Sequence, residues 1–331
     1  MMKITWRPIT LELKNVFRIA HGASARRHNV IVQVEEGLGE AAGVAYHGET
    51  PERIMAYLQT VHLAGDPLHL VDMLAQLPQG GSRAGRAAVD MALHDLWGKR
   101  LGHPLYRLLG LNPADAPSTS FTIAMDEPEA MAERAAASGM PIIKIKVGSE
   151  NDEAMVRAIR RATDARLQVD ANGGWSREQA AAIIPRLAQY DLQIVEQPLP
   201  AGDIEGLRWL RKQGFGVPIF ADEAIKTPDD ILAHAGAVDG VVIKLAKSGG
   251  IRAAVEMIAL ARALGMQVMI GCMVETAVAV TAAAHIAPLC DYADLDGPLL
   301  IANDPFRGLR YDGARLLLPD GPGLGITRRA D

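Results

Sequence analysis

Short apolar runs alternate with amphipathic stretches from Ser118 onward. The runs cover residues 119–124, 142–147, 167–170, 192–196, 217–221, 240–244, 267–271 and 291–295. Between them lie stretches with helical spacing, for example 152–162, 176–189, 228–235, 250–264 and 275–285. Because buried strands that alternate with helices favour parallel βα units, the eight runs predict a (β/α)-barrel. The catalytic groups of such a barrel stand at the carboxyl ends of its strands.

The first third of the chain has a different pattern. Residues 28–36 carry a β-branched run that ends in alternation, and Gly37 and Gly39 predict the turn of an antiparallel hairpin. Residues 51–63 and 83–100 predict helices. We therefore expect an α+β domain over residues 1–115 and a barrel over 116–300. The Gly- and Pro-rich segment 301–331 is expected to pack back on the first domain.

Composition narrows the class of protein. The 331 residues are 49% hydrophobic, which is enough for a large core, and the net charge of −5 does not indicate a nucleic-acid partner. The N-terminus does not resemble a signal peptide, and we find no uncharged apolar stretch of ~18 residues, so no membrane partner is expected. Cys272 and Cys290 could form one disulfide. Two scattered cysteines fit a reducing cytoplasm better, and a cytoplasmic location is expected.

Charged residues end five successive apolar runs. They are Lys146, Asp170, Glu196, Asp222 and Lys244, separated by steps of 24, 26, 26 and 22 residues. Each step is about one βα unit, so the five side chains should point into the same mouth of the barrel. A buried charge is costly unless it is paired or bound to a metal, so this series indicates a site.

Three of these residues form a candidate metal site. Asp170, Glu196 and Asp222 would bring three negative charges together, and a proton or a cation must relieve their repulsion. Because the donors are all carboxylates, without His or Cys, the pattern favours one Mg²⁺ per active site over Zn²⁺. The alternative is that the acids pair with basic groups at the rim of the barrel.

The two lysines flank these acids in sequence order. Strands two and six lie on opposite sides of a closed barrel, so Lys146 and Lys244 would face the two sides of a bound substrate. A lysine serves as a base only if its pKa falls from about 10.4 toward about 7–8, through burial and nearby positive charge. Lys144, on the same side of its strand as Lys146, would supply such a charge. The alternative is that each lysine anchors a phosphate or carboxylate.

The eighth run adds two more acids. Asp294 and Asp296 are two positions apart and share one face of the strand. They would suit a cationic group on the substrate, or they could be an N-cap and a turn residue before Gly297. The segment 247–250, Lys-Ser-Gly-Gly, could bind an anion through its backbone N–H groups, or it could be a plain loop into a helix.

Taken together, several segments resemble the enolase superfamily, and within it the dipeptide epimerases. The matching segments are 86–96 and 102–110, which look like the end of the capping domain, then Lys144-Ile145-Lys146, Asp170-Ala171-Asn172, Glu196-Gln197-Pro198, Asp222-Glu223, and Ile243-Lys244-Leu245 with Lys247 and Gly249-Gly250. Muconate-lactonizing enzymes, o-succinylbenzoate synthases and N-acylamino-acid racemases share the lysine pair. Asp294-Leu295-Asp296 resembles the motif that holds the α-ammonium group in dipeptide epimerases, and Gly271-Cys272-Met273 is similar to that branch.

This resemblance implies an enolase-type barrel with a capping domain that the C-terminal tail completes. It implies 1,1-proton transfer at the α-carbon of a dipeptide's C-terminal residue, with L-Ala-D/L-Glu from cell-wall peptide as the leading substrate. The substrate carboxylate would bind Mg²⁺. One lysine would remove the α-proton to give an enediolate, and the other would return a proton. Lys144, Lys146 and Lys244 would be catalytic, and the substrate would contact Asp294, Asp296, Thr122, Cys272 and Met273.

The loops that select the substrate carry no clear motif. The resemblance implies that two capping-domain loops, residues 18–28 and 44–50, select the substrate side chain. The first loop is basic, and we nominate Arg18 and His21 as partners of an acidic side chain, although solvated surface charge would explain them equally well. Two other functions stay open. One is an N-acylamino-acid racemase or o-succinylbenzoate synthase of the same fold, and the other is a non-catalytic barrel that binds a metal or a peptide. A homo-oligomer is compatible with the sequence but not indicated by it.

Overall fold

A computed structural model describes residues 1–329, and its centre is an eight-stranded parallel barrel. Its strands are β4 (Phe121–Ile123), β5 (Ile142–Lys146), β6 (Arg166–Asp170), β7 (Leu192–Glu196), β8 (Ile219–Ala221), β9 (Gly240–Lys244), β10 (Gln267–Gly271) and β11 (Tyr292–Asp294). They pair in sequence order, and a bridge between Thr119 and Ala293 joins the last strand to the first. The predicted fold class is confirmed.

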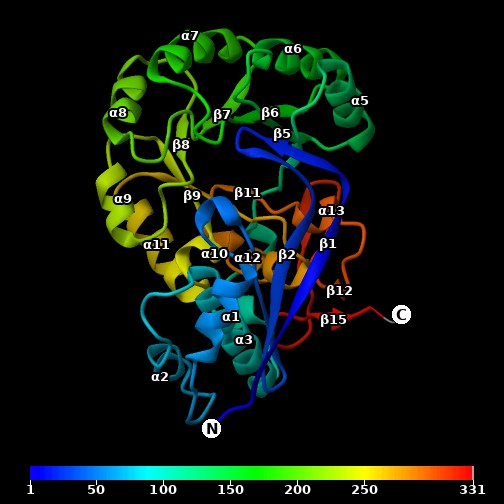
Figure 1. Cartoon of the computed structure of the whole chain (residues 1–331), viewed down its shortest axis with the longest axis vertical. Coiled ribbons are helices and arrows are strands. Elements are labelled where there is room, and N and C mark those ends of the chain that lie inside the picture. Colours follow the sequence, from blue (N-terminus) through cyan, green and yellow to red (C-terminus); the bar gives the residue numbers. More distant parts are fainter. Residues whose placement is uncertain (330–331) are drawn as a thin grey trace.

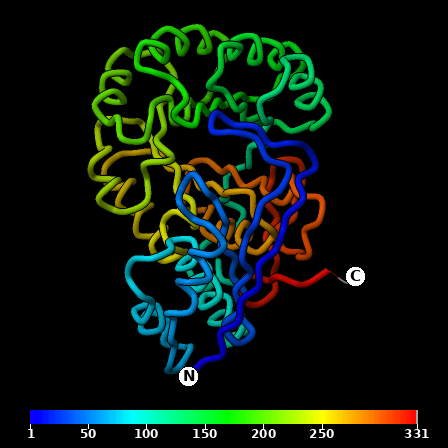
Figure 2. Tube along the Cα trace, in the orientation of Figure 1, coloured from blue at the N-terminus to red at the C-terminus, as the bar shows by residue number. Residues whose placement is uncertain are grey.

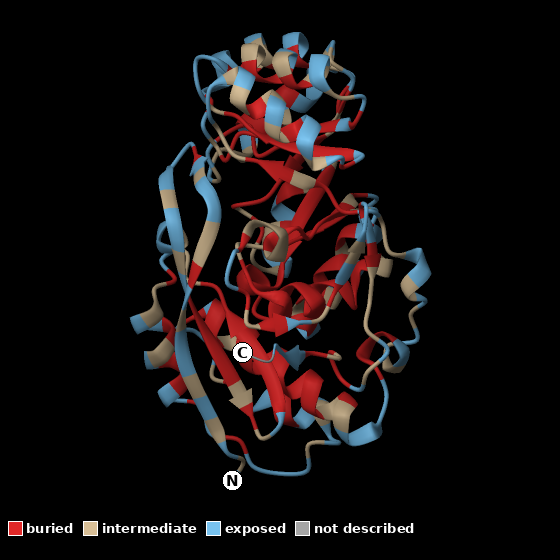
Figure 3. Cartoon of the chain, turned by 90° about the vertical axis from the view of Figure 1, so that its right-hand side faces the viewer, coloured by how far each residue is buried: buried red, intermediate tan, exposed pale blue. Residues whose placement is uncertain are grey.

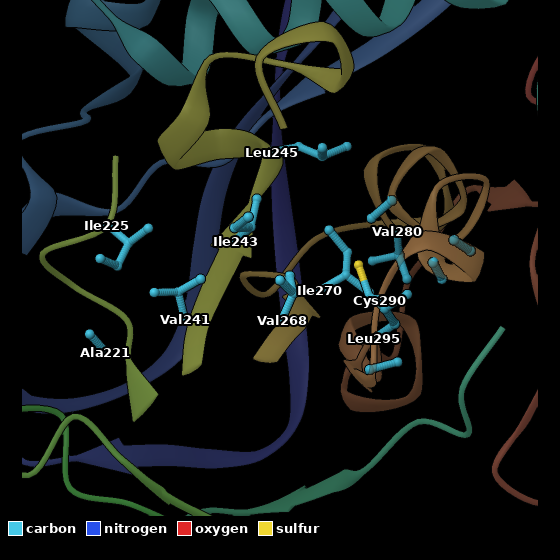
Figure 4. Packing of buried hydrophobic residues seen from close by; sticks show 14 of the residues in the cluster. Ala221, Ile225, Val241, Ile243, Leu245, Val268, Ile270, Val280, Cys290 and Leu295 are labelled. Carbon is cyan, nitrogen blue, oxygen red and sulfur yellow. The ribbon is translucent and has the colours of Figure 1, made fainter. Parts of the chain in front are cut away.

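Helices cover the outside of the barrel (Figure 1). They are α5 (Pro128–Ser138), α6 (Asp152–Ala162), α7 (Arg177–Ala188), α8 (Ile204–Lys212), α9 (Pro228–His234), α11 (Ile251–Ala263) and α12 (Ala277–Ala284), with the short helices α10 (Leu245–Ser248) and α13 (Gly297–Leu300). Val241 and Ile243 of β9 and Val268 and Ile270 of β10 belong to the main buried cluster (Figure 4).

Side chains on the opposite face of these strands fill the barrel. Ile194, Phe220, Val242 and Met269 form a separate buried cluster inside it. Because side chains alternate along a strand, the next inward positions lie two residues further on. Glu196, Asp222 and Lys244 occupy three of these positions, so a charged layer lies directly above an apolar layer.

The N-terminal domain places an antiparallel sheet against helices. Its strands are β1 (Ile4–Ile19), β2 (Gly22–Val34) and β3 (Gly37–Ala41), and its helices are α1 (Pro51–Gln59), α2 (Leu70–Ala75), α3 (Arg83–Leu101) and α4 (Leu105–Leu108). The two predicted helices are present, although α1 ends at Gln59, four residues earlier than expected. Strand β1 lies outside the predicted elements. The exposed end of the β1–β2 hairpin extends beside the barrel (Figures 2 and 3).

The prediction that Gly37 and Gly39 form a hairpin turn is wrong. Both lie within β3, and Glu35 occupies the turn with a φ of 50°. A Cβ atom on Gly37 would lie 2.1 Å from the carbonyl oxygen of Ala92, and one on Gly39 would lie 1.9 Å from that of Ala88. The glycines are therefore needed because helix α3 packs directly on the backbone of β3.

The end of the chain contacts the N-terminal domain. Its short strands are β12 (Phe306–Arg307), β13 (Arg310–Asp312), β14 (Arg315–Leu317) and β15 (Thr327–Arg328). Asp95 of α3 accepts hydrogen bonds from the backbone N–H groups of Leu324 (2.7 Å) and Leu38 (2.8 Å). The backbone N–H of Leu105 donates to the carbonyl of Gly323 at 2.8 Å. The exact domain limits at residues 115 and 300 stay predictions. Within residues 1–329, no helix has the length and apolar character that a membrane crossing requires.

Candidate active site

Five charged residues meet at the carboxyl ends of the barrel strands. Lys146, Asp170, Glu196 and Lys244 are the last residues of β5, β6, β7 and β9, and Asp222 directly follows β8. All five are buried. Their shared position follows from the parallel strands, because each βα unit brings one strand end to the same mouth.

Lys144 lies between carboxylates from three strands. Its Nζ is 2.7 Å from Glu196, 2.8 Å from Asp294 and 3.3 Å from Asp170. Burial disfavours the charged amine, but these carboxylates, Asp294 first, outweigh burial and hold the pKa of Lys144 well above its ordinary value. Lys144 therefore links Asp294 of the last strand to the acids in the middle of the barrel.

The other two lysines of the predicted set also contact acids. The Nζ of Lys146 is 2.5 Å from Asp170, and that of Lys244 is 2.8 Å from Asp222. Burial favours the neutral form of Lys244, but Asp222 outweighs it, so the pKa of Lys244 lies well above its ordinary value. The expected lowering of this pKa is therefore not found in this structure. The alternative to a metal site, in which the acids pair with basic groups, is thus met in part, because Asp170 and Asp222 both contact lysines.

Lys247, which belongs to the segment that resembles the opposing-lysine strand, makes a contact that the sequence did not predict. Its Nζ donates to the carboxylate and to the backbone carbonyl of Asp222. The backbone N–H groups of Gly249 and Gly250 both donate to the carbonyl of Leu245. These two N–H groups are therefore already bonded, which argues against an anion site built on the backbone of the two glycines.

The carboxylates have the chemistry of a site for a hard cation. Burial, and then the neighbouring Asp170, raise the pKa of Glu196 to about 8, and its Oε1 is buried without a hydrogen-bond partner. Asn172 Oδ1 and Glu223 Oε2 are also buried and unpartnered. In the described chain, no three His, Cys, Asp or Glu side chains already have the spacing of a metal site, and lysines stand between these acids. Buried oxygens that have no hydrogen-bond partner, in a cluster of carboxylates, could coordinate a cation.

A small cavity of about 70 Å³ lies between the two lysines. Lys146 and Lys244 line it, and it includes every substrate contact that the resemblance implies within the barrel, namely Thr122, Cys272, Met273, Asp294 and Asp296. Its other lining residues are Phe17, Ile19, Arg27, Gly43, Val44, Tyr46, Asn172, Val274 and Leu300. Ile19, Arg27, Val44 and Tyr46 lie in the two loops, 18–28 and 44–50, that the resemblance assigns to substrate selection, and Asn172 lies in a matching segment, but none of the five was nominated individually. Most of these belong to the N-terminal domain, which covers the mouth of the barrel.

Asp294 and Asp296 are held in place by neighbours from the first strand. Asp294 accepts a hydrogen bond from Ser120 Oγ at 2.6 Å, and Asp296 accepts one from the backbone N–H of Thr122 at 2.6 Å. Burial, and then the charge of Asp294, raise the pKa of Asp296 to about 7. Asp296 precedes α13 but makes no side-chain capping bond, so the N-cap alternative fails.

Arg18 and His21, the two residues nominated to bind an acidic side chain, lie in different surroundings. Arg18 is exposed and does not line the cavity between the lysines, because its neighbours Phe17 and Ile19 occupy the inward-facing positions of β1. His21 stacks on Tyr46, with ring centroids 5.3 Å apart, beside an adjoining cavity of about 450 Å³. Arg27, also in the basic run, lines both cavities. The structure therefore does not bring Arg18 to either cavity, and alternation along the unpredicted strand β1 is the missing signal.

The cysteines are both free, so the disulfide alternative is wrong. Cys272 lines the small cavity. Burial, and then the charge of Asp296, hold the pKa of its thiol well above the ordinary value. This environment disfavours a thiolate nucleophile, and it agrees with a packing or contact role.

Comparison with protein-family models decides the family. Residues 2–110 match the mandelate racemase/muconate lactonizing enzyme N-terminal domain, and residues 127–331 match the enolase C-terminal domain-like model. The chain belongs to the mandelate racemase/muconate lactonizing enzyme family. The predicted membership of the enolase superfamily is thereby confirmed.

Relatives within this family have related activities. The L-Ala-D/L-Glu epimerase of Bacteroides thetaiotaomicron is 41% identical over 99% of this chain and 88% of its own length. A substrate-liganded L-Ala-D/L-Glu epimerase from Bacillus subtilis superposes with a TM-score of 0.93 at 32% identity, covering 100% of this chain and 99% of the other. A dipeptide epimerase from Cytophaga hutchinsonii, complexed with Mg and D-Ala-L-Val, has the same TM-score and identity, with 100% and 97% coverage. This member of the family is an isomerase.

Proposed function

We propose that this isomerase is a magnesium-dependent dipeptide epimerase that inverts the α-carbon of the C-terminal residue. One observation carries the proposal. Lys146 and Lys244 line the same cavity from strands that are four apart in an eight-stranded barrel, and Asp294 and Asp296 line it with them. Two bases on opposite sides of one carbon are what inversion by proton removal and return requires.

The lysines would divide the proton transfer between them. Lys146 would remove the α-proton of one epimer while Lys244 delivers a proton to the other side, and the roles would exchange for the opposite epimer. Asp170, Glu196 and Asp222 would hold the Mg²⁺, which when bound supplies positive charge beside the substrate carboxylate. Lys144 would favour the ionised forms of Asp170 and Asp294, because its ammonium group lies 3.3 Å and 2.8 Å from their carboxylates.

Asp294 and Asp296 support a substrate with a free amino group. Both are buried, and both face the cavity that contains the lysines. Asp294 already pairs with Lys144, whereas Asp296 forms no ion pair within residues 1–329, so an N-terminal ammonium would provide the positive charge that this second carboxylate lacks. An N-acylated amino acid has no such charge, so the pair favours a dipeptide over the substrate of an N-acylamino-acid racemase.

Arg27 supports an acidic side chain on the residue that is inverted, with L-Ala-D/L-Glu as the leading substrate. Its guanidinium donates to the carbonyl of Arg26 at 3.0 Å, and within residues 1–329 it forms no ion pair. Burial lowers the pKa of Arg27, because it disfavours the charged guanidinium. A carboxylate on the substrate would offset this unfavourable free energy. Such a substrate would also fit the turnover of cell-wall peptides in the cytoplasm.

Isotope exchange tests the reaction. The protein would be incubated with Mg²⁺ in D₂O with L-Ala-L-Glu, L-Ala-L-Leu and an N-acetylated glutamate, and each α-carbon would be followed by NMR and chiral chromatography. We expect deuterium uptake with inversion of the dipeptides. Turnover of the N-acyl compound alone would assign a racemase instead, and no exchange with any compound would support a non-catalytic barrel.

Replacement of Arg27 tests the substrate side chain. Arg27→Gln should lower kcat/KM for L-Ala-L-Glu by about 10–100-fold, the scale of a charge-assisted hydrogen bond, and leave L-Ala-L-Leu unchanged. Arg26→Gln is the matched control, because Arg26 already pairs with Glu12 at 2.9 Å. Equal losses on both dipeptides would contradict the assignment to Arg27.

A further inference from the structure

A second cavity, of about 580 Å³, lies between the N-terminal domain and the barrel. It is distinct from the one between the two catalytic lysines, although Val44 and Met273 line both. Five of its lining side chains are cationic, namely Arg53, Arg83, Arg86, Lys226 and Lys247, and only one, that of Glu49, is acidic. Such a concentration of positive charge is unexpected in a protein whose net charge is −5.

Four of these cations have no acidic partner in the described part of the chain. Arg53 donates to the carbonyls of Gly48 and Gly81, and Arg83 donates to the carbonyl of Lys226. Arg86 donates to the carbonyls of Leu77 and Pro78. Carbonyl groups do not neutralise guanidinium groups, so the positive charge at this cavity is uncompensated.

The carboxylate of Glu49 forms no ion pair with these cations, and its single charge is outnumbered by theirs. One oxygen accepts from Ser82 Oγ at 2.5 Å, and the other accepts from the backbone N–H of Arg83 at 2.9 Å. Glu49 therefore occupies the N-terminus of α3 and is not directed at the cations. His47 also lines the cavity, and its Nε2 is buried without a hydrogen-bond partner. The cavity thus contains both unpaired charge and an unused hydrogen-bonding atom.

We propose that this cavity is a binding site for a small molecule that carries two or more phosphate groups. Its volume lies in the range of about 300–1,000 Å³ that is usual for ligand sites. Three guanidinium groups can each bind phosphate oxygens in pairs. Their number, together with Lys226, suits a polyanion better than a single carboxylate.

Lys247 connects this cavity to the active site. It lines the cavity, and its Nζ donates to the carboxylate and backbone carbonyl of Asp222. A polyanion in the cavity competes with Asp222 for this ammonium group. Occupancy therefore changes the charge balance at a candidate metal ligand, and ligand binding is coupled to turnover.

Calorimetric titration with pyrophosphate in metal-free buffer tests the site. We expect one pyrophosphate per chain, an affinity that falls with salt, and a loss of roughly tenfold or more in affinity for Arg83→Gln or Arg53→Gln. Arg157→Gln is the matched control, because Arg157 is an exposed arginine of α6 at the other end of the molecule (Figure 1). Its affinity should equal that of the wild type.

Three results would overturn the site. They are no binding, equal affinity in all variants, and an equal loss in Arg157→Gln, which would indicate general charge attraction. Tighter binding of citrate than of pyrophosphate would overturn the assignment to phosphate. A matching thermal unfolding midpoint for all variants would show that weakened binding does not reflect misfolding.

The coupling has its own readout, which rests on the proposed function. The epimerisation rate would be measured with and without pyrophosphate while free Mg²⁺ is held constant. We expect pyrophosphate to change the rate in the wild type and in Arg157→Gln, but not in Arg83→Gln, whose basal rate should be unchanged. Binding without a change in rate would overturn the coupling. Absence of epimerisation with normal binding would overturn the proposed function and leave the site intact.

Discussion

At the scale of single residues, the proposed function rests on Lys146 and Lys244, which line one cavity from opposite sides of the barrel. Each contacts a different carboxylate, Lys146 that of Asp170 and Lys244 that of Asp222. The two bases therefore have similar but separate surroundings. This arrangement suits a reaction in which either base can begin, because neither side of the substrate is favoured by a unique partner.

Removal of either base should nearly abolish inversion. Lys146→Ala and Lys244→Ala should each lower the epimerisation rate by about 10²–10⁴, the usual contribution of general acid–base catalysis. Each variant should still exchange the α-proton of one epimer, L,L or L,D, because the remaining lysine can remove and return it on its own side. Proton NMR in D₂O with both epimers measures this, and Lys212→Ala on α8 is the control. Full exchange of both epimers in either variant would exclude the two-base mechanism.

The acid pair at the end of β11 should select the free amino group. Asp296→Asn should raise KM for dipeptides by about 10–100-fold, because a charge-assisted hydrogen bond to the ammonium is lost. The preference for the free dipeptide over its N-acetylated form should shrink by the same factor. Steady-state kinetics on the two forms gives this ratio, with Asp312→Asn on exposed β13 as the control. An unchanged ratio would show that Asp296 does not contact the amino group.

Sequence patterns locate the residues at the strand ends well. They locate poorly the residues of the N-terminal domain that line the same cavity. Lys146, Asp170 and Glu196 follow from a regular repeat of about one βα unit, so spacing alone brings them to one mouth. Arg27 and Tyr46 reach the same cavity from another domain, and nothing in their spacing reports it. The family resemblance includes Lys247, but its bond to Asp222 could not be predicted, because that bond depends on the short helix α10. Contacts between distant segments are not periodic, and periodicity is what a single sequence reveals.

Among whole elements, too, some were predicted well from the sequence and others were not. The barrel strands are short and buried on both faces, so their apolar runs are distinct. Strand β1 is largely exposed and carries mixed residues, so it gives no comparable signal (Figure 3). Gly37 and Gly39 have the composition of a turn but serve the close packing of α3 on β3. Glycine allows both uses, and only the neighbouring element distinguishes them.

His285 joins three elements and should make their association dependent on pH. It caps the end of α12, its Nδ1 accepts from the backbone N–H of Tyr106 at 3.1 Å, and its Nε2 lies 3.3 Å from the carbonyl of Leu324. These bonds require a neutral ring with its proton on Nε2. Burial lowers the pKa of His285 to about 4, whereas an unfolded histidine titrates near 6.5.

As the pH falls, the unfolded chain therefore takes up this proton first. The stability from His285 is complete above about pH 6.5 and is lost between there and about pH 4, with a loss of about 2 kcal/mol from pH 7 to pH 5. Urea unfolding of wild type and His285→Gln at both values measures it. The variant should lose about 2 kcal/mol less than the wild type over this range. Parallel losses would show that other groups cause the pH dependence.

At the scale of the whole molecule, Asp95 connects the two ends of the chain. It is fully buried in α3, bonds Leu38 of β3 and Leu324 of the tail, and pairs with Lys99 at 2.7 Å. Asp95→Ala should lower the free energy of unfolding by about 3–5 kcal/mol, because two buried N–H groups and an ammonium lose their partner. Urea unfolding followed by circular dichroism would show it. Asp164→Ala, at an exposed position, should change stability by less than about 0.5 kcal/mol, and a similar small change in Asp95→Ala would contradict this role.

The tail that reaches Asp95 also sets an order of events during synthesis. Leu324 follows Asp95 by 229 residues, so the ribosome needs about 10–45 s to make the intervening chain at 5–20 residues per second. During that time the first domain has a buried carboxylate without its final partner. The N-terminal domain of this protein is therefore made well before the C-terminal segment that supplies its last hydrogen bond to Asp95.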